Sequence, residues 1–167
     1  MVGWIIISVL VLLQALQGAP AYLLGDGGFL LRASTYSLFH ANWFHLAVNC
    51  IALWTIFVKP RKRYPCKPCR DLLIPYIIAM AVYPLSARPL IGFSNVLYAI
   101  IGMRTPPFRS AWWRGRNVWI FLGATLLLGL LPQLSTLTHL AAFAAGTACA
   151  AVGRVYKNTL NDAGRYL

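Results

Sequence analysis

Six stretches of mostly apolar residues, separated by polar or charged connections, follow one another along the chain. They occupy residues 2–17, 36–58, 72–86, 91–103, 117–131 and 136–153. Such stretches are typical of helices that lie in a membrane, although several fall short of the ~20 residues that usually span a bilayer. We expect these helices to extend into their flanks or to lie in a locally thinned membrane. The pattern predicts an all-α integral membrane protein with a bundle of six transmembrane helices.

The composition agrees with this interpretation. The 167 residues are 59% hydrophobic and only 11% charged, which leaves too few polar residues to cover a soluble domain of this size. The sequence has no evident internal repeat, and no connection is long enough to separate two domains. We therefore expect a single membrane domain over residues 1–167.

The distribution of basic residues predicts the orientation in the membrane. Of the 15 Lys and Arg residues, 13 lie in the second connection, the fourth connection and the C-terminal tail, whereas Arg32 and Arg88 lie in the others. Basic residues concentrate on the cytoplasmic side of membrane proteins, so six helices would place both termini in the cytoplasm. We expect a multi-pass protein of a prokaryotic inner membrane. Because topology accounts for the net charge of +12, nucleic acid is not an expected partner.

The first apolar stretch has an alternative interpretation as a cleaved signal peptide, because Ala19-Pro20-Ala21 resembles a cleavage site. However, the preceding MVGW carries no Lys or Arg, and a signal peptide begins with a basic segment. Its removal would also leave five helices and disturb the charge asymmetry.

Cys66 and Cys69 form a CKPC pair in the basic second connection. One such pair supplies half of a zinc site, and this connection has no second pair or histidine to complete it. Reduced thiols are the favoured state, with zinc shared between two chains as the alternative.

All three histidines fall within apolar stretches, together with Asn49 and Ser94. An ionisable residue in a membrane segment is a functional hypothesis by default, because it is costly in hydrocarbon. His40, His45 and Asn49 lie in the first half of the second stretch, Ser94 opens the fourth, and His139 opens the sixth. With a cytoplasmic N-terminus, all three stretches begin at the outer face. We therefore expect these residues at a similar depth on the same side.

The residue types indicate nucleophilic catalysis. Ser94 follows Gly92 at an expected helix start, where unsatisfied N–H groups favour a developing negative charge. A serine needs a base, and His139 is the candidate. His45 and Asn49 share one helix face and would donate hydrogen bonds to an oxyanion. The three acids, Asp26, Asp71 and Asp162, lie outside these helix starts, so the chemistry would be that of a Ser–His dyad.

Structural explanations and one further function remain open at this point. A serine before a helix is commonly an N-cap, and histidine and asparagine commonly form hydrogen bonds between membrane helices. His40, His45 and His139 could instead bind a metal ion or haem. The lack of a supporting carboxylate and the presence of Ser94 argue against that site, so no metal or other cofactor is expected.

Over nearly its whole length the chain resembles the rhomboid intramembrane serine proteases, in their minimal six-helix form. The motif HxxxxHxxxN is matched by His40, His45 and Asn49. The motif GxSGxxYAxxG is matched by Gly92, Ser94, Tyr98, Ala99 and Gly102, and HxxGxxxG by His139 and Gly146. The loop motif WR-x-x-T keeps Arg32 and Thr35 but has Leu31 in place of tryptophan.

The resemblance implies a role for each of these residues. Ser94 would be the nucleophile and His139 the base, with Tyr98 packed on its ring. His45, Asn49 and the Ser94 N–H would form the oxyanion hole, and Arg32 and His40 would be structural. The loop after the first helix would lie partly in the membrane. The expected activity is endopeptidase cleavage of the transmembrane segments of membrane proteins.

Two positions depart from the motifs. Asn95 stands where the motif has glycine after the serine, and Ala142 replaces the first glycine of the last motif. A side chain at position 95 is expected to crowd the substrate or to reshape the oxyanion hole. This leaves an alternative function, a pseudoprotease that binds transmembrane helices without cutting them.

Overall fold

In the computed structural model every regular element is helical within the residues it describes, which are 2–16, 28–54, 69–86, 90–104, 123 and 135–163. The helices are α1 (Val2–Ala15), α3 (Phe29–Thr35), α4 (Trp43–Leu53), α5 (Ile74–Val82), α6 (Ser94–Arg104) and α8 (Thr136–Ala163). Two 3-10 turns, η1 (Tyr36–Leu38) and η4 (Tyr83–Leu85), follow α3 and α5, and a π-helical turn, η3 (Cys69–Leu73), precedes α5.

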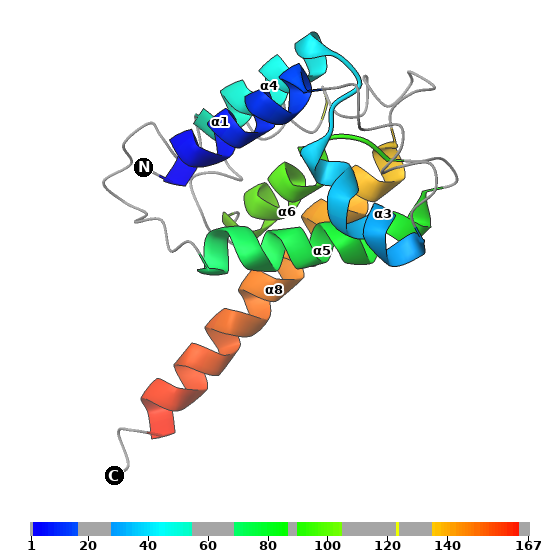
Figure 1. Ribbon diagram of the computed structural model, residues 1–167. Coiled ribbons are helices and arrows are strands. Elements are labelled where there is room, and N and C mark those ends of the chain that lie inside the picture. The colour runs from blue at the N-terminus through cyan, green and yellow to red at the C-terminus, as the bar shows by residue number, and fades with distance from the viewer. Residues whose placement is uncertain are drawn as a thin grey trace.

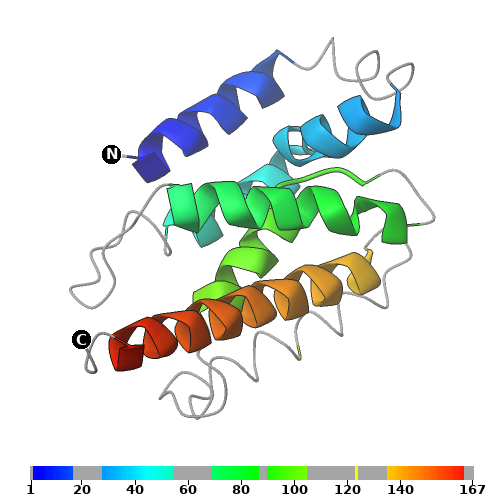
Figure 2. The same ribbon diagram turned by 90° about the horizontal axis from the view of Figure 1, so that it is seen from below.

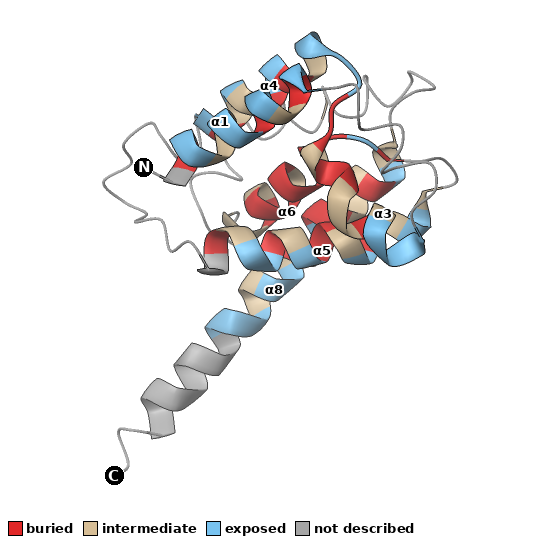
Figure 3. Cartoon of the chain, in the orientation of Figure 1, coloured by how far each residue is buried: buried red, intermediate tan, exposed pale blue. Residues whose placement is uncertain are grey.

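Helix α6 lies in the middle of the molecule (Figure 1) and contacts α4, α5, α8 and η1. Helices α1 and α4 lie side by side on one flank, and the view from below shows α5 and α8 on the other sides of α6 (Figure 2). Burial follows this arrangement, because α6 is mostly buried whereas α1 and α4 turn exposed faces outward (Figure 3). The central helix therefore carries its side chains into the core.

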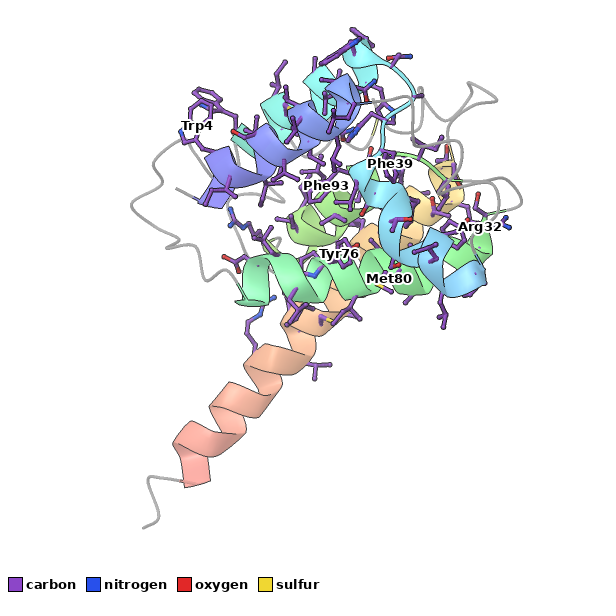
Figure 4. The ribbon with its side chains drawn as sticks, in the orientation of Figure 1. Trp4, Arg32, Phe39, Tyr76, Met80 and Phe93 are labelled. Carbon is purple, nitrogen blue, oxygen red and sulfur yellow. The ribbon has the colours of Figure 1, made fainter. Side chains whose placement is uncertain are left out.

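The outer faces are strongly apolar. Phe44 is 79% exposed, Ile51 63% and Leu12 59%, and Trp4 extends outward from α1 (Figure 4). Among the described residues, Thr136–Arg154 of α8 is the one helix that is long and apolar enough to cross a membrane. Shorter apolar helices cover Gly3–Ala15, Trp43–Leu53 and Asp71–Leu85. Large apolar side chains exposed on several helices are typical of a surface that faces lipid.

The apolar pattern located most of the described helices. The stretches 2–17, 72–86, 91–103 and 136–153 each contain the expected helix, and α8 continues to Ala163. The stretch 117–131 lies outside the described residues except for the helical Gly123, so the count of six helices stays a prediction. Cys66 of the CKPC pair and most of the basic connections also lie outside the described residues, whereas Cys69 opens η3.

The region between α1 and α4 differs from the expectation. The connection 18–34 was expected to be a loop, but helix α3 forms at its end, where the Tyr76 hydroxyl of α5 donates to the Ser34 carbonyl. The stretch 36–58 was expected to be one helix, but α4 begins only at Trp43, since the Asn42 side chain caps it by accepting the His45 N–H at 2.8 Å. His40 therefore lies before α4 and not within it.

Two glycines allow α6 and α8 to touch through their backbones. A Cβ atom on Gly102 would collide with the Phe143 carbonyl oxygen, and one on Gly146 would collide with that of Ala99. The Thr147 hydroxyl of α8 lies within hydrogen-bond distance of the Gly102 carbonyl oxygen, at 3.3 Å. Small residues permit this close approach of membrane helices.

Ala142 is fully buried in the same contact, in a cluster with Ile78, Val82 and Ala99. A methyl group is therefore accommodated at this departure from the motif, and the backbone contacts are made at Gly102 and Gly146.

The other end of α6 is tied to the start of α5 by an ion pair. Arg104 Nη2 lies 3.4 Å from Asp71 Oδ2, and the Asp71 side chain is 6% exposed. Removing one partner of a partly buried ion pair destabilises the folded protein, because the other charge is left without compensation.

The glycine contact predicts a specific response to an added methyl group. Gly146→Ala should lower the free energy of unfolding by ~1–3 kcal/mol, because the two backbones must separate to admit the new carbon. Gly153→Ala on the same helix is the matched control, since a Cβ there meets nothing within 4 Å. Thermal unfolding in detergent measures both variants. Equal unfolding midpoints for the two would contradict the close contact.

Candidate active site

The start of α6 is set by Gly92. Its φ is +113°, in a region that residues with a side chain rarely adopt. The first helical hydrogen bond then runs from the Leu97 N–H to the Phe93 carbonyl at 3.1 Å. The N–H groups of the first turn, including that of Ser94, have no acceptor within the helix, and they concentrate positive potential at its start.

The hydroxyl of Ser94 meets the imidazole of His139. Ser94 Oγ lies 2.8 Å from His139 Nε2, although the two residues are 45 positions apart on α6 and α8. The His139 ring stacks on Tyr98, with ring centroids 4.6 Å apart and planes 11° from parallel. Tyr98 lies one helical turn after Ser94, so α6 supplies both the hydroxyl and the stacked ring that contact this imidazole.

His45 and Asn49 approach the same turn from α4. A Cβ at Gly92 would lie 2.5 Å from Cε1 of His45, so the histidine ring rests against the backbone two residues before Ser94. Asn49 is 3% exposed, and its Nδ2 donates to the His45 carbonyl at 3.1 Å. An amide nitrogen carries two hydrogens, so this bond leaves one for another acceptor.

The turn before Ser94 is held by residues from the η1 region. The Gly92 N–H donates to the Tyr36 carbonyl at 3.0 Å, and the Phe93 N–H donates to His40 Nε2 at 3.4 Å. The His40 side chain is 2% exposed, and its ring packs edge-on against that of His45 with centroids 5.2 Å apart. His40 thus contacts the backbone next to Ser94.

Arg32 is not part of this cluster. It lies on α3 at the edge of the molecule, whereas Phe93, next to Ser94, lies in the centre (Figure 4). Thr35, the other residue matched to the loop motif, donates its hydroxyl to the Leu31 carbonyl at 2.7 Å, a contact within α3.

Asn95 bonds to η1, and its expected effect on the substrate or the oxyanion hole stays a prediction. Its side chain is 2% exposed, and its Nδ2 donates to the Tyr36 hydroxyl at 3.1 Å. The amide therefore points to η1 and lies within the core. Tyr36 was not among the residues predicted from the sequence, where the one signal for it is a tyrosine placed just before the histidine motif.

The arrangement holds the groups that acyl transfer uses. No group of three or more His, Cys, Asp or Glu side chains that could hold a metal occurs among the described residues. Asp71, the one acid whose side chain the structure describes, pairs with Arg104 at the opposite end of α6. A serine hydroxyl bonded to an imidazole at a helix N-terminus is the arrangement that nucleophilic catalysis requires.

Comparison with protein families identifies a match that covers most of the chain. The family model described as the Rhomboid domain matches residues 28–155, which include every residue of the candidate active site. A search of curated proteins finds no match.

The turn at Gly92 predicts a large effect of a single methyl group. Gly92→Ala should lower the free energy of unfolding by ~1–3 kcal/mol, because the backbone conformation is strained for alanine and the methyl group displaces the His45 ring. Gly28→Ala is the control, as a Cβ there meets nothing within 4 Å. Denaturant or thermal unfolding in detergent checks the pair, and a Gly92→Ala protein as stable as the control would contradict this geometry.

Proposed function

Since the chain belongs to the rhomboid family of integral membrane proteins, we propose that it is an intramembrane serine endopeptidase. Its substrates would be membrane proteins, cut within a transmembrane segment. Membership of this family alone is compatible with either a protease or a pseudoprotease. The observation that carries the proposal is the hydrogen bond of 2.8 Å between Ser94 Oγ and His139 Nε2.

In the proposed reaction, His139 Nε2 removes the proton from Ser94 as Oγ attacks the peptide carbonyl. The oxyanion accepts hydrogen bonds from the Ser94 N–H, the His45 ring and the free amide hydrogen of Asn49. The C–N bond then breaks, and the imidazolium gives its proton to the leaving amine. A water molecule, deprotonated by the same imidazole, hydrolyses the acyl-enzyme and restores Ser94.

Tyr98 takes the place of a carboxylate as the group that orients the imidazole. Its stacked ring restricts the rotation of His139 without adding a charge, which would be costly in a low-dielectric site. Stacking fixes the plane of the ring, and the Ser94 hydroxyl fixes which nitrogen faces the nucleophile.

The length of α6 supports cleavage within the membrane. Its 11 residues rise about 16 Å, roughly half of a ~30 Å hydrocarbon core. If the Arg104–Asp71 pair lies at the cytoplasmic interface, as the basic connections predict, Ser94 lies near the middle of the bilayer. Backbone N–H groups at that depth must face protein or water, and a water-filled cavity would also supply the hydrolytic water.

The binding-only alternative rests on Asn95, and the structure offers it little support. The amide of Asn95 is bonded to Tyr36, while Ser94 Oγ remains within hydrogen-bond distance of His139. We therefore favour the protease. We further propose that it lies in a prokaryotic inner membrane with both termini on the cytoplasmic side, as the basic connections predict.

Ser94→Ala and His139→Ala should each lower the rate of cleavage of a model transmembrane substrate at least ~10³-fold, because each removes a member of one catalytic unit. Ser94→Ala should also abolish covalent labelling by a fluorophosphonate probe. Ser34→Ala is the matched control, since that hydroxyl bonds only within α3. Equal cleavage by wild type and Ser94→Ala would refute the assignment. A folded wild type that neither cleaves nor labels would support the pseudoprotease.

The oxyanion role of Asn49 can be tested separately from the nucleophile. Asn49→Ala should lower kcat ~10²-fold, because it removes a donor that acts mainly in the transition state, while KM changes little. Val48→Ala, the exposed neighbour on the same helix, should leave both constants unchanged. A loss confined to KM would assign Asn49 to substrate binding instead.

A further inference from the structure

Tyr36 contacts the backbone and side chain of the Ser94 turn at two points. Its carbonyl accepts the Gly92 N–H at 3.0 Å, two residues before Ser94. Its hydroxyl accepts Nδ2 of Asn95 at 3.1 Å, one residue after Ser94. One residue of η1 thus holds the chain on both sides of the candidate nucleophile.

Tyr36 is itself firmly held. Its side chain is 1% exposed, and its hydroxyl donates to the Ala79 carbonyl of α5 at 2.9 Å. In a regular α-helix the Ala79 carbonyl would accept the Tyr83 N–H. Here the Tyr83 N–H bonds to the Met80 carbonyl, which receives no N–H from Pro84 because proline has none. The Ala79 carbonyl is therefore available to the Tyr36 hydroxyl. The end of α5 therefore anchors Tyr36, and Tyr36 anchors the Ser94 turn.

The side chain of Asn95 is unfavourable in one respect. Its Oδ1 is buried and has no hydrogen-bond partner among the described residues. A buried acceptor without a partner destabilises the folded protein, so packing alone would favour an apolar residue of similar size. The amide makes one hydrogen bond, and that bond ends on the residue that holds the other side of the turn.

We propose that Asn95 and Tyr36 form a clamp that fixes the Ser94 hydroxyl for attack, which makes Asn95 a positioning residue for this chain. The inference rests on the proposed protease function. The clamp ties the first turn of α6 to α5 through η1, so that Ser94 Oγ stays in place relative to His139 on α8. Asn95 is then an adaptation of this site and not a defect in it.

The test compares the rate of Ser94 labelling by a fluorophosphonate probe with thermal stability, using the purified full chain in detergent. Asn95→Leu keeps the side-chain size and removes both the hydrogen bond and the buried acceptor. We expect its unfolding midpoint to stay the same or rise, while its labelling rate falls ~10-fold through misplacement of the hydroxyl. A purely structural role would lower the labelling rate only together with the unfolding midpoint.

Tyr36→Phe tests the other half of the clamp. Because it also removes the bond to the Ala79 carbonyl, it should lower the labelling rate at least as much as Asn95→Leu does. The double variant Tyr36→Phe/Asn95→Leu should be no slower than Tyr36→Phe alone, because that variant has already lost the bond to Asn95. Tyr83→Phe is the matched control. It removes a hydroxyl from the ring that packs on Tyr36 at 5.2 Å and leaves the Asn95 bond intact, so labelling should be unchanged.

The outcomes separate the two proposals. If Ser94→Ala is labelled as fast as wild type, or if folded wild type is not labelled, the protease function fails and the clamp fails with it. If labelling depends on Ser94 but Asn95→Leu reacts at the wild-type rate, the clamp alone is overturned. Rate losses that multiply in the double variant would likewise overturn it, since the two residues would then act independently.

Discussion

The backbone contact between α6 and α8 is the constraint on which the rest of the structure depends. Gly102 and Gly146 each lack a Cβ where the other helix passes, so the two axes come closer than larger residues would permit. Ser94 and His139 lie near the beginnings of these helices, and the close approach brings their side chains to 2.8 Å. The glycines that permit this distance thus lie about two turns away from Ser94 and His139 along their helices.

A second constraint is the division between polar and apolar surroundings. The outer faces of α1, α4 and α5 expose large apolar side chains, whereas the polar side chains of the site meet one another around the first turn of α6. In a low-dielectric interior, an unpaired polar group is expensive and a paired one is strong. The apolar surroundings that exclude polar groups from the outer faces therefore also strengthen the internal hydrogen bonds that position the side chains of the site.

The sequence predicted the parts of this arrangement that depend on local pattern. Apolar stretches located α1, α5, α6 and α8, and Gly92 indicated that a helix would begin at Ser94. Helix α3 was not foreseen because its seven residues are too few for a periodic signal, and its contact with Tyr76 is tertiary. The start of α4 was misplaced because apolar residues continue through 36–41, although Asn42 is a recognisable N-cap.

The contacts of Asn95 show why local pattern could not predict the rest. From the sequence alone, a side chain after the serine is expected to interfere with the substrate or the oxyanion hole, because only its neighbours along the chain are known. Its actual partner is 59 residues away, on a turn whose position depends on α3 and α5. A substitution that breaks a local motif can therefore be compensated by a distant residue of matching chemistry. In the proposed clamp, such a pair keeps the Ser94–His139 geometry intact, and that geometry is what the proposed protease needs.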